Sequence, residues 1–167
     1  MFFFSFSSYF SWMFPFFLWV DSTWLHNYIQ GTTWVFPLVE TIHILSLVVL
    51  LGSILLIDVR LLGIGIREWP PSQLANGLRS YIKWGLIAIL VTGSLLFIAE
   101  PKKLYDNIGF GPKMVLLALA IIYQFTLFPK ASSINKLTTP VWAKAAAVLS
   151  LVLWFGVGFC GRAIGFV

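Results

Sequence analysis

The chain has 167 residues, of which 59% are apolar and only 10% are charged, and its formal net charge is +5. An ordinary soluble domain has about a quarter of its residues charged, so this composition predicts a protein that lies in lipid and argues against a soluble one. The eleven Lys and Arg residues lie between apolar segments and are not grouped with aromatics on one face, which argues against a nucleic-acid partner.

The first twenty residues are rich in aromatic side chains and contain neither Lys nor Arg. A cleavable signal peptide begins with positive charge and ends with small residues, so we expect this segment to be retained. Pro15 would break or kink a helix, and aromatic residues concentrate at membrane interfaces. We therefore predict that residues 1–33 form an interfacial or partly inserted N-terminal segment. Its last part, 23–30, is predicted as a short amphipathic helix capped by Asp21 or Ser22.

Four apolar segments follow, at about residues 35–59, 81–99, 113–128 and 141–164. A helix of roughly 20 apolar residues is what the hydrocarbon core of a bilayer requires. Prolines 101 and 129 are predicted to end the second and third segments, and the basic stretch between the first two is predicted as a loop. The predicted fold class is all-α, an integral membrane four-helix bundle over residues 34–167.

The basic residues predict an orientation. Seven of them lie beside the first and third connections, namely Arg60, Arg67, Arg79, Lys83, Lys130, Lys136 and Lys144. Four lie on the opposite side, namely Lys102, Lys103, Lys113 and Arg162. Because basic residues are in excess on the cytoplasmic side, both the C-terminus and the N-terminal segment are predicted to lie outside.

The first span carries two ionisable residues where lipid should forbid both, Glu40 and His43. At about 100° per residue they share an arc of roughly 140° with Ser46, Ser53 and Asp58, which predicts one polar stripe facing the bundle interior. Ionisable groups inside a span are costly and are therefore candidates for function. His43 is predicted either to ligate a metal, above all haem iron, or to handle protons, with Glu40 orienting it. The alternative is a structural histidine that hydrogen-bonds between helices.

The other helices bring ionisable groups to the same outer layer. Lys113 begins the third span and Arg162 lies near the end of the fourth. We predict that Arg162 pairs with Glu40 or with a haem propionate through its bidentate guanidinium, while snorkelling at the interface is its alternative. Lys113 is a weaker candidate because it can be an interface anchor.

A bound haem can take a second axial ligand, for which His26 and Met114 are the nearest candidates. For copper the soft candidates are His43, Met114 and Cys160, although Cys160 and Arg162 lie roughly 160° apart on one helix. As the single cysteine, Cys160 excludes an intramolecular disulfide and every multi-cysteine metal site. Dinucleotide-binding and hydrolase motifs are absent.

Several motifs resemble a family of small bacterial inner-membrane proteins of unassigned function. They are W-x-F-P-x-x-E-x-x-H at 34–43, G-S-x-x-x-x-D-x-R-L-L-G at 52–63, T-G-x-x-L-F at 92–97, F-G-P-K at 110–113 and W-F-G-V-x-x-C-G-R at 154–162. That family is distantly similar to the membrane domain of copper-resistance D proteins and to small b-type cytochrome bundles. The resemblance implies a four-helix bundle in a bacterial inner membrane, with a histidine on the periplasmic side.

The function predicted from these observations is binding of haem b, or a related metal centre, through His43, with Glu40, Arg162 and Lys113 tuning or anchoring it. Its role would be electron transfer or cofactor handling. Two alternatives are a non-catalytic accessory subunit of a larger membrane complex and a copper or proton-coupled transporter. Besides the lipid bilayer, the predicted partner is a second copy of the chain or another membrane subunit.

Overall fold

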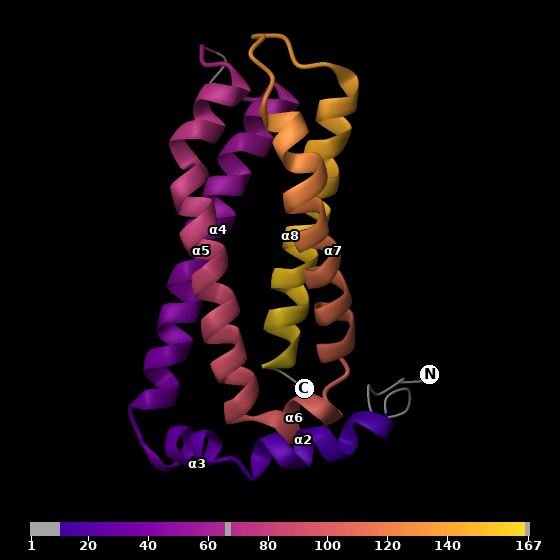
Figure 1. The fold of residues 1–167 in the computed structure, drawn as a ribbon. Coiled ribbons are helices and arrows are strands. Elements are labelled where there is room, and N and C mark those ends of the chain that lie inside the picture. The colour runs from indigo at the N-terminus through magenta and orange to yellow at the C-terminus, as the bar shows by residue number, and fades with distance from the viewer. Residues whose placement is uncertain (1–10, 66–67, 166–167) are drawn as a thin grey trace.

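The computed structural model describes residues 11–65 and 68–165. These residues form seven α-helices and one short 3₁₀ helix, η1 (Ser11–Met13), without a strand among them. The predicted all-α class is confirmed, and Figure 1 shows an elongated bundle with its shorter helices gathered at one end.

Four of the described helices are long and apolar enough to cross a membrane. They are α4 (Val35–Leu62), α5 (Pro71–Ala99), α7 (Phe110–Ser132) and α8 (Val141–Ile164). Many of their large apolar side chains are exposed, which suits a surface in contact with lipid rather than water. The chain is therefore a multi-pass membrane protein.

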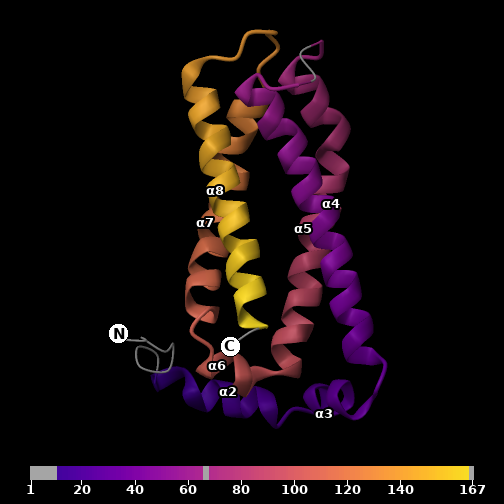
Figure 2. The ribbon, with the colours of Figure 1, turned by 180° about the vertical axis from the view of Figure 1, so that it is seen from behind.

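The four helices pack as two antiparallel pairs, α4 with α5 and α7 with α8. The pairs meet mainly between α4 and α8, and Figures 1 and 2 show them side by side from the two opposite views. Buried apolar residues of α4 begin only at Leu50 and continue through Ile54, Ile57 and Leu61. The best-buried part of α4 thus lies toward the end that carries the connections 63–70 and 133–140, which we call the loop end.

The opposite end is covered by three short helices, α2 (Phe14–Asp21), α3 (Trp24–Gly31) and α6 (Pro101–Asp106). We call them the cap, and Figure 1 shows α2 and α3 lying across the long helices. An eight-residue helix is too short to cross the hydrocarbon core. The predicted interfacial segment therefore corresponds to α2 and α3 from residue 11 onward, while residues 1–10 lie outside the described part. The division into 1–33 and 34–167 stays a prediction.

Aromatic packing holds α2 on the bundle. Phe17 is buried, and its ring centroid lies 5.1 Å from that of Tyr105 in α6 and 5.3 Å from that of Phe97 in α5. Phe97 in turn stacks on Phe110, the first residue of α7, at 5.9 Å. Part of the N-terminal aromatic content thus forms a small core between the cap and the long helices.

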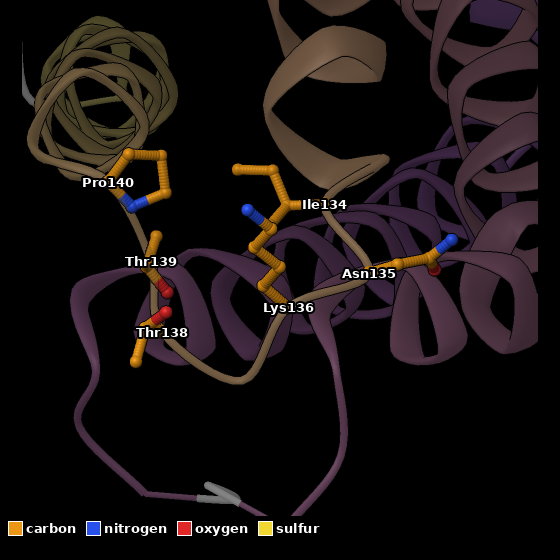
Figure 3. Close-up of a pocket in the computed structure, with 6 residues that line it drawn as sticks. All are labelled: Ile134, Asn135, Lys136, Thr138, Thr139 and Pro140. Carbon is orange, nitrogen blue, oxygen red and sulfur yellow. The ribbon is translucent and has the colours of Figure 1, made fainter.

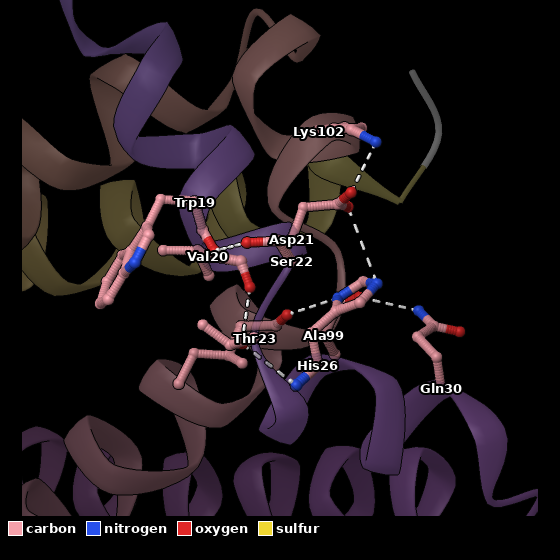
Figure 4. Close-up of polar contacts among 10 residues, drawn as sticks. Trp19, Val20, Asp21, Ser22, Thr23, His26, Gln30, Ala99 and Lys102 are labelled. Carbon is pink, nitrogen blue, oxygen red and sulfur yellow. Dashed lines mark hydrogen bonds and ion pairs between the residues drawn. The ribbon is translucent and has the colours of Figure 1, made fainter.

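Polar contacts join α3 to the end of α5, as Figure 4 shows. His26 Nδ1 donates to the Ile98 carbonyl at 2.9 Å, and Gln30 Nε2 donates to the Ala99 carbonyl at 2.7 Å. The last carbonyls of a helix have no N–H partner within that helix, so side chains of α3 donate hydrogen bonds to the terminal carbonyls of α5. Asp21 completes the junction through an ion pair with Lys102 of α6.

Several predicted boundaries were wrong. The helix α5 begins at Pro71, ten residues before the predicted start, because proline is well suited to the first turn of a helix. The helix α7 continues through Pro129 to Ser132, since a proline so near the end removes little of the hydrogen-bond ladder. The cap of α3 is Thr23 rather than Asp21 or Ser22: its hydroxyl accepts from the His26 amide at 3.3 Å.

The loop end is tied together by Arg60 of α4, which is only 1% exposed. Its Nε donates to the Trp69 carbonyl at 2.5 Å, and its Nη2 donates to the Leu137 carbonyl at 3.1 Å. One side chain therefore connects the two loops that join the helices of each pair. Ser72 and Asn135 form a further hydrogen bond between the same regions.

We predict that Arg60→Met destabilises the bundle by roughly 1.5–3 kcal/mol for each charge-assisted hydrogen bond lost, because both loop carbonyls lose their donor. Thermal unfolding in detergent measures the effect. The control is Arg79→Met, since Arg79 is exposed on α5. Equal stability of the two variants would contradict the role given to Arg60.

A second prediction concerns the close approach of α4 and α5. A Cβ added at Gly85 would lie 3.1 Å from Leu50 Cβ and 3.4 Å from its backbone, so Gly85→Val should force the helices apart and cost about 1–3 kcal/mol. Gly77, also on α5, has nothing within 4 Å of an added Cβ. Gly77→Ala is therefore expected to keep full stability, and the two unfolding midpoints test the difference.

Candidate functional site

His43 of α4 lies in the half of the bundle nearer the cap, and its ring is partly buried against α5. Its Nδ1 is 2.8 Å from the hydroxyl oxygen of Thr92, a residue that is only 7% exposed. The ring also lies over Gly93, where an added Cβ would come within 3.4 Å of His43 Cε1. The small residues of α5 thus bring the imidazole close to the α5 backbone.

The hydrogen bonds around Thr92 assign the proton on Nδ1. The Thr92 hydroxyl donates its one proton to the Ala88 carbonyl at 2.6 Å, because a carbonyl can only accept. Thr92 therefore accepts from His43, whose Nδ1 must carry a hydrogen. In the neutral ring of this tautomer, Nε2 keeps its lone pair. A histidine held through one nitrogen with the other available is the arrangement typical of a metal ligand.

Lys113 of α7 also reaches this region. It is partly buried and close enough to His43 and to Cys160 of α8 for electrostatic interaction with both. A Cβ at Gly161 would lie 3.7 Å from Lys113 Cε and Nζ, so the ammonium group packs where α8 has no side chain. The predicted meeting of groups from the first and third spans is thus found for His43 and Lys113.

Glu40 and Arg162 do not join them. Glu40 is exposed, and Thr92 rather than Glu40 holds the His43 ring. Arg162 is exposed near the end of α8, and within the described residues it forms no ion pair with Glu40. The predicted polar stripe is therefore only partly internal: Ser53 and Asp58 are buried, while Glu40 faces outward.

Of the two candidate second ligands, His26 is engaged elsewhere in the fold, while Met114 stays a prediction. His26 belongs to the cap, where Nδ1 bonds to Ile98 and Nε2 lies 3.7 Å from the Asp21 carboxylate, so both ring nitrogens are engaged. Met114 is 46% exposed at the start of α7. His43 thus remains as the histidine with a nitrogen available.

No group of three or more His, Cys, Asp or Glu side chains comes together as a metal site in the described ranges. A hollow of about 510 Å³ lies at the loop end, lined by residues of the connection between α7 and α8 such as Lys136 and Thr139 (Figure 3). His43 lies in the other half of the bundle, so this hollow is not part of its site. A smaller one between α4 and α5 is lined by Ser46 and Trp84 among others, again without His43.

Sequence reasoning missed the role of Thr92. A threonine in a membrane helix often bonds only to its own backbone, so its residue type alone does not indicate a partner on another helix. The pairing depends on the register between α4 and α5, which puts position 92 opposite position 43. One signal was available, since an embedded imidazole needs a polar partner and α5 offers few.

A comparison with models of protein families finds a match for this chain. A family model covers residues 16–167, and its description is a family of unknown function, DUF6644. No curated protein and no solved structure matches the chain. The match spans most of the cap and all four long helices, and the chain therefore belongs to the family DUF6644.

Proposed function

We propose that this membrane protein binds haem b, or a closely related metal centre, through Nε2 of His43, and that it serves electron transfer or cofactor handling. The observation that carries the proposal is the hydrogen bond from Nδ1 to Thr92, which leaves Nε2 as the ligating atom. A bound haem would supply one-electron redox chemistry. The chain's own residues would orient the haem, neutralise its charge and shield it from water.

The donor set favours a porphyrin over a bare metal ion. Copper or zinc takes several ligands from protein side chains, and no group of three His, Cys, Asp or Glu is present in the described chain. A porphyrin brings four nitrogen ligands of its own and needs only one from the protein. His43 alone therefore suffices for a haem, whereas it does not for copper.

Lys113 adds a positive charge beside His43, from the opposite helix pair. An ammonium group in this position can neutralise a haem propionate, which is one way in which Lys113 would anchor the group, as predicted from the sequence. Arg162 is exposed near the same end of the bundle, where a propionate that reaches the interface would meet it. Glu40, also exposed, would act on the centre only through its charge.

The cellular setting is part of the proposal. The excess of basic residues at the loop end supports a cytoplasmic loop end and a periplasmic cap in a bacterial inner membrane. The haem site would then lie in the outer half of the bilayer, within reach of a partner on that side. We also propose, from the sequence motifs, that the fold is distantly similar to b-type cytochrome bundles and to copper-resistance D membrane domains.

The direct test is the absorption spectrum of protein purified from haem-replete cells. The wild type is expected to show a Soret band, and His43→Ala is expected to lose it because the ligating nitrogen is gone. His26→Ala, which removes the other histidine of the chain, should keep it. A colourless wild-type preparation would overturn the haem proposal and favour an accessory subunit.

A second test addresses Thr92. Thr92→Val keeps the side-chain volume but removes the acceptor for Nδ1, so haem affinity should fall by about 10–100-fold, as for other outer-shell partners. Thr92→Ser retains a hydroxyl and is expected to bind nearly as well as the wild type. Haemin titration of the apoprotein measures both. Wild-type affinity in the valine variant would show that Thr92 does not position the ligand.

A further inference from the structure

A carboxyl group in the core near the loop end has no part in the proposed function. Asp58 of α4 is 0% exposed. Neither of its oxygens has a hydrogen-bond partner within the described residues. A buried unpaired polar group is costly, and a buried unpaired charge is far more so. A neighbouring donor, a neighbouring charge or a bound proton must therefore compensate the carboxyl group.

Two polar side chains that interact with Asp58 or its neighbour come from the other helix pair. The Ser150 hydroxyl of α8 lies beside both the Asp58 carboxyl and the Tyr123 phenol of α7, and its oxygen is itself buried and unpaired. Tyr123 donates its proton to the Ala146 carbonyl at 2.8 Å, so toward any other neighbour its oxygen can only accept. The cluster of Asp58, Ser150 and Tyr123 therefore has more acceptors than donors.

Among the residues that the structure describes, no basic side chain forms an ion pair with Asp58. Arg60, two residues further on, is also buried, but its guanidinium donates to the carbonyls of Trp69 and Leu137 and forms no ion pair with Asp58 in the described structure. The α5 residues packed in the core at this end are apolar, among them Leu74 and Leu78. The other basic residues of the neighbouring helices are exposed, namely Arg79, Lys83, Lys130 and Lys144.

We propose that Asp58 is a proton-binding site, in which the carboxyl group carries a proton in the folded bundle and offers it to the Ser150 hydroxyl. A proton supplies the donor that the cluster lacks and removes the buried charge. A metal cation suits the site less well, because hard cations such as Ca²⁺ take about six to eight oxygen ligands. Asp58 offers two oxygen ligands, and Ser150 and Tyr123 offer one each.

The position of Asp58 indicates from which side the proton exchanges. Asp58 lies four residues from the end of α4 at Leu62, about 6 Å along the helix axis, and 23 residues from its start at Val35, about 35 Å. Exchange therefore takes place with the loop end, the side opposite to the His43 site. This proton site stands independently of haem, because a colourless protein can still carry a protonated Asp58.

Infrared spectroscopy of the full chain in lipid nanodiscs tests the proposal. The chain has three aspartates, of which Asp21 is paired with Lys102 and Asp106 is exposed. With ¹³C-labelled aspartate, the carbonyl band of a protonated carboxyl at neutral pH is expected to shift, which assigns it to an aspartate without any substitution. Asp58→Asn should abolish the band, and Asp106→Asn should retain it.

Two results would overturn the proposal. The first is a labelled wild-type spectrum without a protonated aspartate band at neutral pH. The second is a band that disappears when Na⁺ or K⁺ is added at constant pH, since this would make the site one for a metal cation. If Asp58→Asn fails to fold, the labelled wild-type spectrum and the salt titration still decide.

Discussion

The whole structure depends on one constraint: a polar group that leaves water for the interior of a membrane bundle must find a partner inside the protein. His43 satisfies it through Thr92, and Arg60 satisfies it through the carbonyls of two loops. The terminal carbonyls of α5 satisfy it through His26 and Gln30. Each of these partnerships also joins two parts of the fold, so the polar contacts specify how the apolar helices are arranged.

The two ends of the bundle meet this constraint in different ways. Toward the cap, His43 and Lys113 come from different helix pairs and leave one imidazole nitrogen available. Toward the loop end, α4 is closely packed, and Asp58 lies there among Ser150 and Tyr123. The proposed haem ligand and the proposed proton site therefore lie toward opposite ends of the bundle.

Much of this was predictable from the sequence, and the limits have physical causes. The length of the apolar segments predicted the four long helices. His43 was singled out because an ionisable side chain is costly inside a membrane span. Helical periodicity placed Glu40 and Asp58 on one stripe, yet only Asp58 is buried, because α4 gains its buried contacts from Leu50 onward. The roles of Thr92 and Ser150 depend on which residues of other helices lie opposite, and a single chain does not encode that register in any local pattern.

The central claim is that Thr92 fixes the His43 tautomer with the hydrogen on Nδ1. Solid-state ¹⁵N NMR of histidine-labelled, cofactor-free protein in lipid tests it most directly, and a His26→Ala variant assigns the two rings. We expect a protonated Nδ1 and an unprotonated Nε2 for His43, and we expect Thr92→Val to lose this preference for Nδ1. A hydrogen on Nε2 and a bare Nδ1 would contradict it.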